Sequence, residues 1–146
     1  MILYNLQLKN GLLLAPMSGY TNWPMRMLCR RFGAEICYTE MISAAGLVRR
    51  TANTKKILVR PSDDWPLVAQ IFTESSEEAS LAAHMLEDEG FDGIDINMGC
   101  PVKKVVLKSA GAALMKDVNR AVRIAESAKS AVRIPVSMKT VSYTHL

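Results

Sequence analysis

The sequence is poor in cysteine, and the few cysteines that it has are not arranged in pairs. Cys29, Cys37 and Cys100 are odd in number and form no Cys-x-x-Cys motif. They therefore indicate neither a disulfide framework nor a zinc site, and no metal is expected. Thiols in this arrangement are typical of a reducing compartment, so we expect them to be free.

Long hydrophobic runs are absent as well. No apolar stretch approaches the roughly 20 residues that a membrane-spanning helix needs, and residues 1–5 lack the basic-then-apolar pattern of a signal peptide. We therefore expect a cytoplasmic protein that does not bind membranes. No Gly-x-Gly-x-x-Gly motif follows the first predicted strand, which argues against a Rossmann dinucleotide-binding domain.

The composition is that of one folded domain. The chain has 146 residues, of which 49% are hydrophobic, enough to build a core. Its net charge of +4 permits a nucleic-acid partner. The lysines and arginines are dispersed along the sequence, however, so charge alone indicates such a partner only weakly.

Apolar strand-like segments alternate with helix-like segments along the chain. The predicted strands lie within residues 5–14, as two strands joined by an Asn10-Gly11 hairpin turn, and at 36–39, 67–71, 93–97 and 134–139. Helices are expected from Thr21 or Asn22 to Gly33, over 43–50 and 75–90, as a short helix or turn at 111–115, and after Asp117. Residues 51–64 are expected to form a surface excursion, and 101–110 a mobile basic loop carrying Lys103, Lys104 and Lys108.

This alternation predicts an α/β fold with a parallel sheet covered by helices. Both a TIM (β/α)8 barrel and an open doubly wound sheet fit the pattern. About five of the eight strands of a barrel are accounted for. Helical spacing also predicts which residues face the core: Met25, Leu28, Cys29 and Phe32; Ala79, Ala82, Ala83 and Leu86; and Val118, Ala121, Val122 and Ala125.

Polar residues recur where the predicted strands end. They are Ser18, Glu40, Gln70, Asn97, Cys100 and Lys139. In a barrel the carboxyl ends of all strands form one ring around the mouth, so these side chains are expected to converge on one site. Cys100 stands out because it follows an alternating strand and lies between Gly99 and Pro101, which force a turn.

Five segments taken together resemble the tRNA-dihydrouridine synthases, a family of flavin-dependent TIM-barrel enzymes. The segments are Ala15-Pro16-Met17-Ser18-Gly19-Tyr20-Thr21, Thr39-Glu40-Met41, Val68-Ala69-Gln70, Asp95-Ile96-Asn97-Met98-Gly99-Cys100-Pro101 and Val136-Ser137-Met138-Lys139. The resemblance covers nearly the whole chain up to Lys139. It implies FMN as the cofactor, NADPH as the electron donor and tRNA as the substrate.

The resemblance also implies a role for each matching residue. Cys100 matches the proton donor and Asn97 a residue that faces the target base. The cofactor-binding positions are Pro16, Met17 and Ser18 against FMN, Gln70 at the flavin ring edge and Lys139 at the base of the flavin site. A thiol suits proton donation because its unperturbed pKa of about 8.5 keeps it protonated at neutral pH.

The resemblance stops after Lys139, where the family continues into an Arg-x-Gly segment and further strands. Here Val141-Ser142-Tyr143-Thr144-His145-Leu146 follows. We therefore expect residues 1–140 to be a partial TIM-barrel flavin-binding catalytic domain and 141–146 to be a foreign or misread tail. The flavin phosphate site of TIM barrels follows strands seven and eight, so we expect this fragment to be inactive alone.

Two other functions remain open at this stage. One is a flavin TIM-barrel reductase that acts on a free pyrimidine or an enone. The other is a non-catalytic RNA-binding half barrel.

Overall fold

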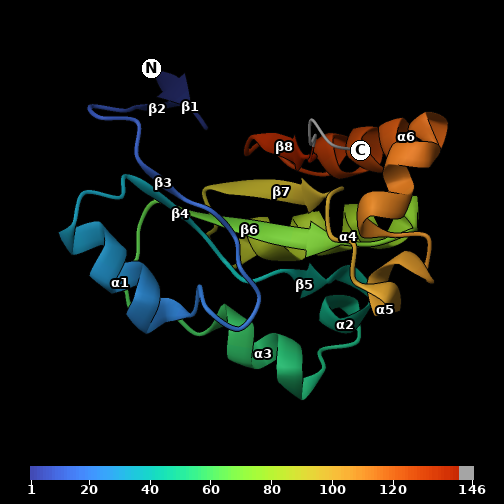
Figure 1. The fold of residues 1–146 in the computed structure, drawn as a ribbon, viewed down its shortest axis with the longest axis horizontal. Coiled ribbons are helices and arrows are strands. Elements are labelled where there is room, and N and C mark those ends of the chain that lie inside the picture. Colours follow the sequence, from blue (N-terminus) through green and yellow to red (C-terminus); the bar gives the residue numbers. More distant parts are fainter. Residues whose placement is uncertain (142–146) are drawn as a thin grey trace.

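The computed structural model describes residues 1–141. Its centre is a curled parallel sheet in the order β3-β4-β6-β7-β8, and a short β5 also pairs with β6 (Figure 1). The strands are β3 (Leu13–Leu14), β4 (Ile36–Tyr38), β5 (Ile42–Ser43), β6 (Leu67–Phe72), β7 (Gly93–Asn97) and β8 (Val136–Lys139). The prediction of an α/β half barrel with about five parallel strands is confirmed.

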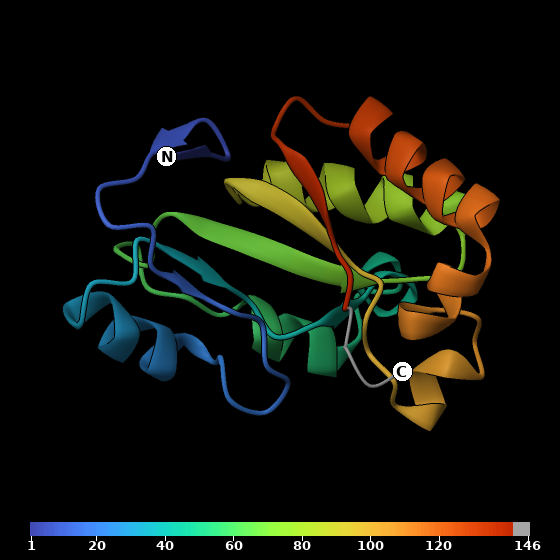
Figure 2. The ribbon, with the colours of Figure 1, turned by 45° about the horizontal axis from the view of Figure 1, so that its top comes forward.

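Helices follow the strands and pack against one face of the sheet. They are α1 (Trp23–Arg31), α2 (Ala44–Val48), α3 (Ala52–Leu58), α4 (Ser76–Asp88), α5 (Lys103–Val106), a 3-10 helix (Gly111–Lys116) and α6 (Val118–Ser130). Figure 2 shows α4 and α6 side by side along one flank of the sheet, with α1 on the opposite flank. No helix in the described residues is long and apolar enough to cross a membrane.

Sequence-encoded caps begin the longest helices. Asn22, Ser75 and Asp117 each accept a hydrogen bond from a backbone N–H in the first turn of α1, α4 and α6 respectively. The predicted core face of α4 is confirmed, because Ala79, Ala82, Ala83 and Leu86 are fully buried. This helix packs against α6 and α2 as well as against the sheet.

Alternation along the strands separates an apolar face from a polar one. In β6 and β7, Ala69, Ile71, Ile94 and Ile96 join the main core beneath the helices. Gln70 and Asp95, which are paired in the register, lie at the alternate positions and therefore point to the opposite face of the sheet. The two-residue period of the strands therefore delivers polar groups to the barrel interior.

The predicted Asn10-Gly11 hairpin turn is wrong. The hairpin lies earlier, between β1 (Ile2–Leu3) and β2 (Leu6–Gln7), with Tyr4 and Asn5 at positive φ in the turn. Asn10 and Gly11 instead belong to a loop. The backbone N–H groups of Lys9, Asn10 and Gly11 donate to the carboxylate of Glu35, and these bonds, that of Lys9 most of all, lower the pKa of the Glu35 carboxyl. The loop leads into β3, which pairs in parallel with β4.

The predicted apolar core stripe of α1 is also wrong. Leu28 is 50% and Phe32 79% exposed, whereas the fully buried residue of the helix is Arg26. The Arg26 guanidinium donates to Asp64 at 2.7 Å and to the Thr21 carbonyl at 2.6 Å. A paired charge therefore occupies the face that packs on the sheet, where helical spacing predicted methionine, leucine and phenylalanine.

Two further predictions need correction. In α6 the predicted Ala121 and Ala125 do pack against the core, but Val118 and Val122 are exposed and the buried residues are Ile124 and Ala128, because the helix is rotated relative to the predicted stripe. Residues 51–64 are not merely a surface excursion. They contain α3, and Asp64 at their end is buried against Arg26.

The segment 101–110 is not a mobile loop throughout, since Lys103–Val106 form the short helix α5. Val105 is buried and anchors this helix, and the three lysines of the segment stay exposed. The predicted tail at 141–146 lies outside the described residues except for Val141.

Candidate functional site

A cavity of about 360 Å³ lies at the carboxyl ends of the central strands and is lined by most of the predicted site residues. Its walls are Pro16, Ser18, Met41, Gln70, Asn97, Gly99, Cys100, Val102, Lys139 and Val141. The convergence expected of a barrel mouth is therefore present, because residues on or after five strands, β3, β4, β6, β7 and β8, share one opening. We call this cavity the central pocket.

Glu40, which was expected to converge on the site, does not line the central pocket, and neither does Met17. The backbone of Met17 instead fixes the loop after β3. The Met17 carbonyl accepts the backbone N–H and the hydroxyl of buried Thr21, and the Met17 N–H donates to the same hydroxyl. The Gly19 N–H donates to the carboxylate of Glu40, which follows β4. The loop that carries Pro16 and Ser18 is therefore fixed by hydrogen bonds within itself and by one to the segment after β4.

A row of buried polar side chains crosses the concave face of the sheet. Gln70, Asp95 and Ser137 stand opposite one another on β6, β7 and β8. The Gln70 Nε2 donates to Asp95 Oδ2 at 2.7 Å, and the Ser137 hydroxyl donates to Asp95 Oδ1. Strand register alone thus brings together three residues that are far apart in the sequence.

Asn97 extends this row to the turn that carries the cysteine. Its Nδ2 donates to Gln70 Oε1 at 3.0 Å, and its Oδ1 accepts the backbone N–H groups of Gly99 at 3.2 Å and Cys100 at 2.9 Å. An ionised Asp95 carboxylate can only accept hydrogen bonds, so Gln70 must turn its Nε2 toward Asp95 and its Oε1 toward Asn97. Each amide is therefore oriented by its neighbour.

The other end of the row reaches two tyrosines below the pocket. The Tyr4 hydroxyl is hydrogen-bonded to Ser137 and receives a hydrogen bond from Tyr38 at 3.2 Å. Burial is the main reason why the pKa of Tyr4 lies far above its usual value, and burial also raises that of Tyr38. Both phenols are therefore neutral donors at physiological pH.

Asp95 is the charged centre of this row and is only 2% exposed. Burial raises the pKa of its carboxyl above the usual range, and the hydrogen bonds from Gln70 and Ser137 and the charge of Lys139 oppose that rise. The net direction is upward, so desolvation outweighs the stabilising contacts.

The backbone of Cys100 is fixed by the segment at residues 111–112 as well as by Asn97. The Cys100 carbonyl accepts the Ala112 N–H at 3.0 Å. Gly111 has a φ of +60°, and a Cβ there would lie 2.7 Å from the same carbonyl oxygen, so the backbone can approach this closely only because the residue is glycine. The half-buried thiol is thus presented to the pocket by a turn clamped on both sides.

The other cysteines are in different surroundings. Cys37 is fully buried in the main core, and burial raises the pKa of its thiol to about 11. Cys29 lies on α1 and lines none of the cavities described here. Among residues 1–141 no group of three His, Cys, Asp or Glu side chains could hold a metal ion.

Asp95, Ser137 and Tyr4 belong to the site although the sequence did not single them out. For two of them a signal exists, since Asp95 and Ser137 are polar residues at alternate positions in strands that otherwise read as apolar. Tyr4 gives no such signal, because its contact with Ser137 depends on where the N-terminal hairpin folds against the sheet.

Comparison with known proteins gives consistent matches. A sequence profile described as dihydrouridine synthase (Dus) matches residues 13–142. A protein of Rhizobium leguminosarum bv. phaseoli named "Probable tRNA-dihydrouridine synthase" is 40% identical over 134 residues, which are 92% of this chain and 42% of that protein. The tRNA-dihydrouridine synthase B of Vibrio parahaemolyticus is 39% identical over 136 residues, 93% of this chain and 42% of its own length. The chain thus spans about two-fifths of the length of these relatives.

Proposed function

The chain belongs to the dihydrouridine synthase family, and we propose that it carries the proton-donating half of an enzyme that reduces uridine in tRNA to 5,6-dihydrouridine. The observation that carries this proposal is the placement of the Cys100 thiol in the central pocket, on a turn fixed by Asn97 and beside Gln70 and Lys139. The relatives are named for this reaction on tRNA.

The reaction needs a proton and a hydride at adjacent carbons. Reduction of the C5=C6 double bond places the hydride on C6 and leaves electron density on C5, which then takes a proton. A thiol is mostly protonated at neutral pH, whereas a carboxylic acid is mostly ionised, so Cys100 suits the donation to C5. The thiolate that remains is reprotonated from water before the next cycle.

Asn97 serves the same step in two ways. Its Oδ1 holds the Cys100 backbone N–H, which sets the direction of the thiol, and one Nδ2 hydrogen is committed to Gln70. The second Nδ2 hydrogen is left for a carbonyl of the base. Asn97 is therefore proposed both to position the donor and to bind the target uracil.

The residues around the central pocket fit the ring portion of a flavin. When bound, FMN supplies the hydride, with NADPH as the source of electrons. We assign Pro16, Met17, Ser18, Gln70 and Lys139 to its binding. The lining has no carboxylate, and the ammonium of Lys139 would stabilise the negative charge of a reduced ring. Gln70 retains one N–H and one acceptor site beyond its bonds to Asp95 and Asn97, which suits a ring edge that offers both donors and acceptors.

Cys100→Ala, compared with Cys29→Ala, tests the proposal in the protein as the cell makes it. With unmodified tRNA, FMN and NADPH, we expect Cys100→Ala to lower dihydrouridine formation at least 100-fold and to leave tRNA affinity unchanged, consistent with the contribution of a positioned acid. Cys29→Ala should keep full activity. Dihydrouridine is measured by mass spectrometry of digested tRNA. Full activity of Cys100→Ala, or reduction of free uracil without reduction of tRNA, would overturn the proposal.

A further inference from the structure

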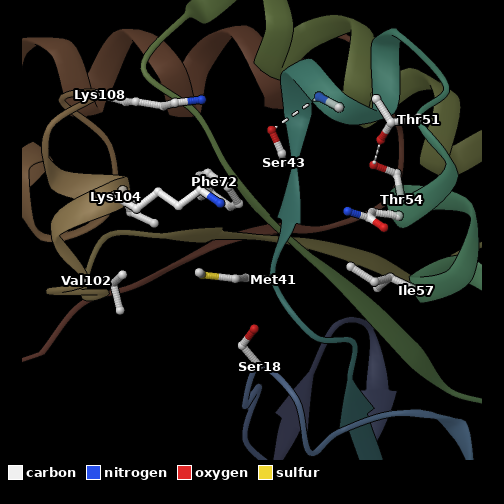
Figure 3. A pocket seen from close by; sticks show the side chains of 13 residues that line it. Ser18, Met41, Ser43, Thr51, Thr54, Ile57, Phe72, Val102, Lys104 and Lys108 are labelled. Atoms are coloured by element: carbon white, nitrogen blue, oxygen red, sulfur yellow. Dashed lines mark hydrogen bonds between the residues drawn. The ribbon is translucent and has the colours of Figure 1, made fainter.

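A second cavity, of about 480 Å³, adjoins the central pocket. The two cavities share Ser18, Met41 and Val102 in their walls, so they lie next to each other at these residues. The second cavity lies between the α2–α3 segment and α5, and Figure 3 shows its lining. Its volume is within the range of about 300–1,000 Å³ that is usual for small-ligand sites. We call it the flanking pocket.

The charge around the flanking pocket is of one sign. Lys104 and Lys108 contribute to its wall, and Figure 3 shows both side chains directed from the α5 segment toward Phe72 and Ser43. No aspartate or glutamate lines either cavity, and neither lysine forms an ion pair with any carboxylate in residues 1–141. The ammonium groups of Lys104 and Lys108, with no carboxylate to neutralise them, favour an anionic ligand in this cavity.

Opposite the lysines the wall is made of hydroxyl groups. Ser43 accepts the Gly46 N–H at 3.2 Å and keeps its own hydrogen for a ligand, while Thr51 and Thr54 share one hydrogen bond of 2.9 Å. A Cβ on Gly46 would lie 2.9 Å from the Thr54 hydroxyl oxygen, so glycine at this position lets the hydroxyl groups gather. Such groups suit a ribose.

The remaining wall is apolar. Ile57 and Phe72 are partly buried and line the cavity together with Met41 from the shared wall. A flat apolar surface is what a nucleobase packs against in proteins that bind single-stranded RNA. Cation, hydroxyl and apolar groups in one cavity match the phosphate, ribose and base of a ribonucleotide.

We propose that the flanking pocket binds the ribonucleotide next to the target uridine in the RNA chain, with Lys104 and Lys108 contacting its phosphates. This inference rests on the proposed function, which places the target uridine in the central pocket. Consecutive nucleotides are joined by a single phosphate, so the neighbour of a uridine held there must lie in an adjoining space. Two cavities share wall residues with the central pocket, the flanking pocket and one other. The other is lined by the Asp95 carboxylate, whereas the flanking pocket has two lysines and no carboxylate.

Lys103 provides a matched control for the test. It is the neighbour of Lys104 on α5, has the same charge and is exposed, but it does not line the flanking pocket. The experiment measures the binding of a fluorescein-labelled hexauridylate to the chain by anisotropy, over a series of potassium chloride concentrations. The variants are Lys103→Ala, Lys104→Ala and Lys108→Ala.

We expect Lys104→Ala and Lys108→Ala each to weaken hexauridylate binding several-fold. Each should also reduce the slope of log K against log salt by about 0.7, the value for one phosphate contact on a single strand. Lys103→Ala should leave the slope unchanged, and free uridine should bind equally well to all three variants. Equal effects of the three lysines, which would indicate diffuse attraction, would overturn the proposal. So would no effect of Lys104 and Lys108, or a loss of free uridine binding in their variants.

The two proposals can fail separately. If Cys100→Ala leaves dihydrouridine formation intact while the lysine variants show the expected contrast, the assigned proton donor is wrong and the RNA contact stands. If Cys100→Ala abolishes dihydrouridine formation while Lys103→Ala and Lys104→Ala bind hexauridylate alike, the flanking pocket is wrong and the proposed function stands.

Discussion

Removing the Asp95 carboxylate should lower the stability of the fold, because this carboxylate accepts hydrogen bonds from two neighbours and orients the polar row of the site. Asp95→Ala leaves the Gln70 Nε2 without its acceptor in a buried region, whereas the Ser137 hydroxyl can turn to donate to Tyr4. An orphaned buried donor costs about 1–3 kcal/mol. We therefore expect a loss of about 1–3 kcal/mol, which is a substantial part of the roughly 5–15 kcal/mol that stabilises a typical domain.

Asp95→Asn should cost much less, under about 1 kcal/mol, because hydroxyl groups can rotate. The asparagine Oδ1 would still accept from Gln70, and its Nδ2 would donate to Ser137. The Ser137 hydroxyl would then donate to Tyr4 instead of to residue 95, and Tyr4 to Tyr38. The amide orientation from Gln70 to the Cys100 turn would be preserved.

The difference between wild type and Asp95→Asn should also depend on pH. The folded-state pKa of Asp95 is raised by burial, so the folded protein holds its proton at pH values where the unfolded chain has lost it. Wild-type stability therefore falls as the pH rises from the ordinary aspartate pKa, about 3.9, through the raised folded value. The substituted asparagine cannot titrate, so the variant should gain on the wild type across this window.

Urea denaturation followed by circular dichroism, at pH 4 and at pH 7, measures all of these differences. Other groups titrate in both proteins and cancel in the comparison. A loss below about 0.5 kcal/mol for Asp95→Ala would refute the continuous row. A variant Asp95→Asn as unstable as Asp95→Ala would refute the rotation argument, and a difference that does not change with pH would refute the raised pKa.

Three further predictions concern packing and reactivity. Gly93→Ala should lower the free energy of unfolding by about 1–3 kcal/mol in urea denaturation, because its Cβ would lie 2.5 Å from the Tyr4 ring; an unchanged midpoint would contradict this contact. Arg26→Ala should cost about 3–5 kcal/mol by leaving the buried Asp64 carboxylate with only one cationic partner, and a loss like that of a surface lysine would contradict it. Iodoacetamide at pH 8 should modify Cys37 last of the three thiols, as read by peptide mass spectrometry, because burial raises its pKa to about 11; early modification would show that the core opens readily.

The central pocket could be predicted from the sequence because two local rules determine most of it. Strand alternation places Gln70 and Asn97 on the face opposite the apolar core, and parallel strands bring their carboxyl ends to one edge. Those rules, together with the motif around Cys100, identified all of its polar lining residues. They could not predict the hydrogen bonds between these residues, because these depend on the strand register. Asp95 can bond to Ser137 only because the register of β7 and β8 places the two residues opposite each other.

Helix faces were harder to predict because burial depends on what packs against the helix. The spacing of Met25, Leu28 and Phe32 is that of a core stripe, yet the side of α1 that meets the sheet carries Arg26. Arg26 was not recognisable as buried, because its partner Asp64 lies 38 positions away in a segment that reads as polar and irregular. A charge is expected on the surface until its counter-charge is located.

The exposed apolar faces have one geometric explanation. In residues 1–141, β3 and β8 are the edges of the sheet, each paired with one strand only. Helix α1 lies on the side of the sheet that ends in β3 and contacts β4, and α6 packs against β8 (Figure 2). A closed barrel has no such edges, and each of its helices packs between two others. The periodicity of α1 and α6 is therefore that expected of a ring of helices, and the predicted core residues that are exposed belong to the two helices nearest the open edges of the half barrel.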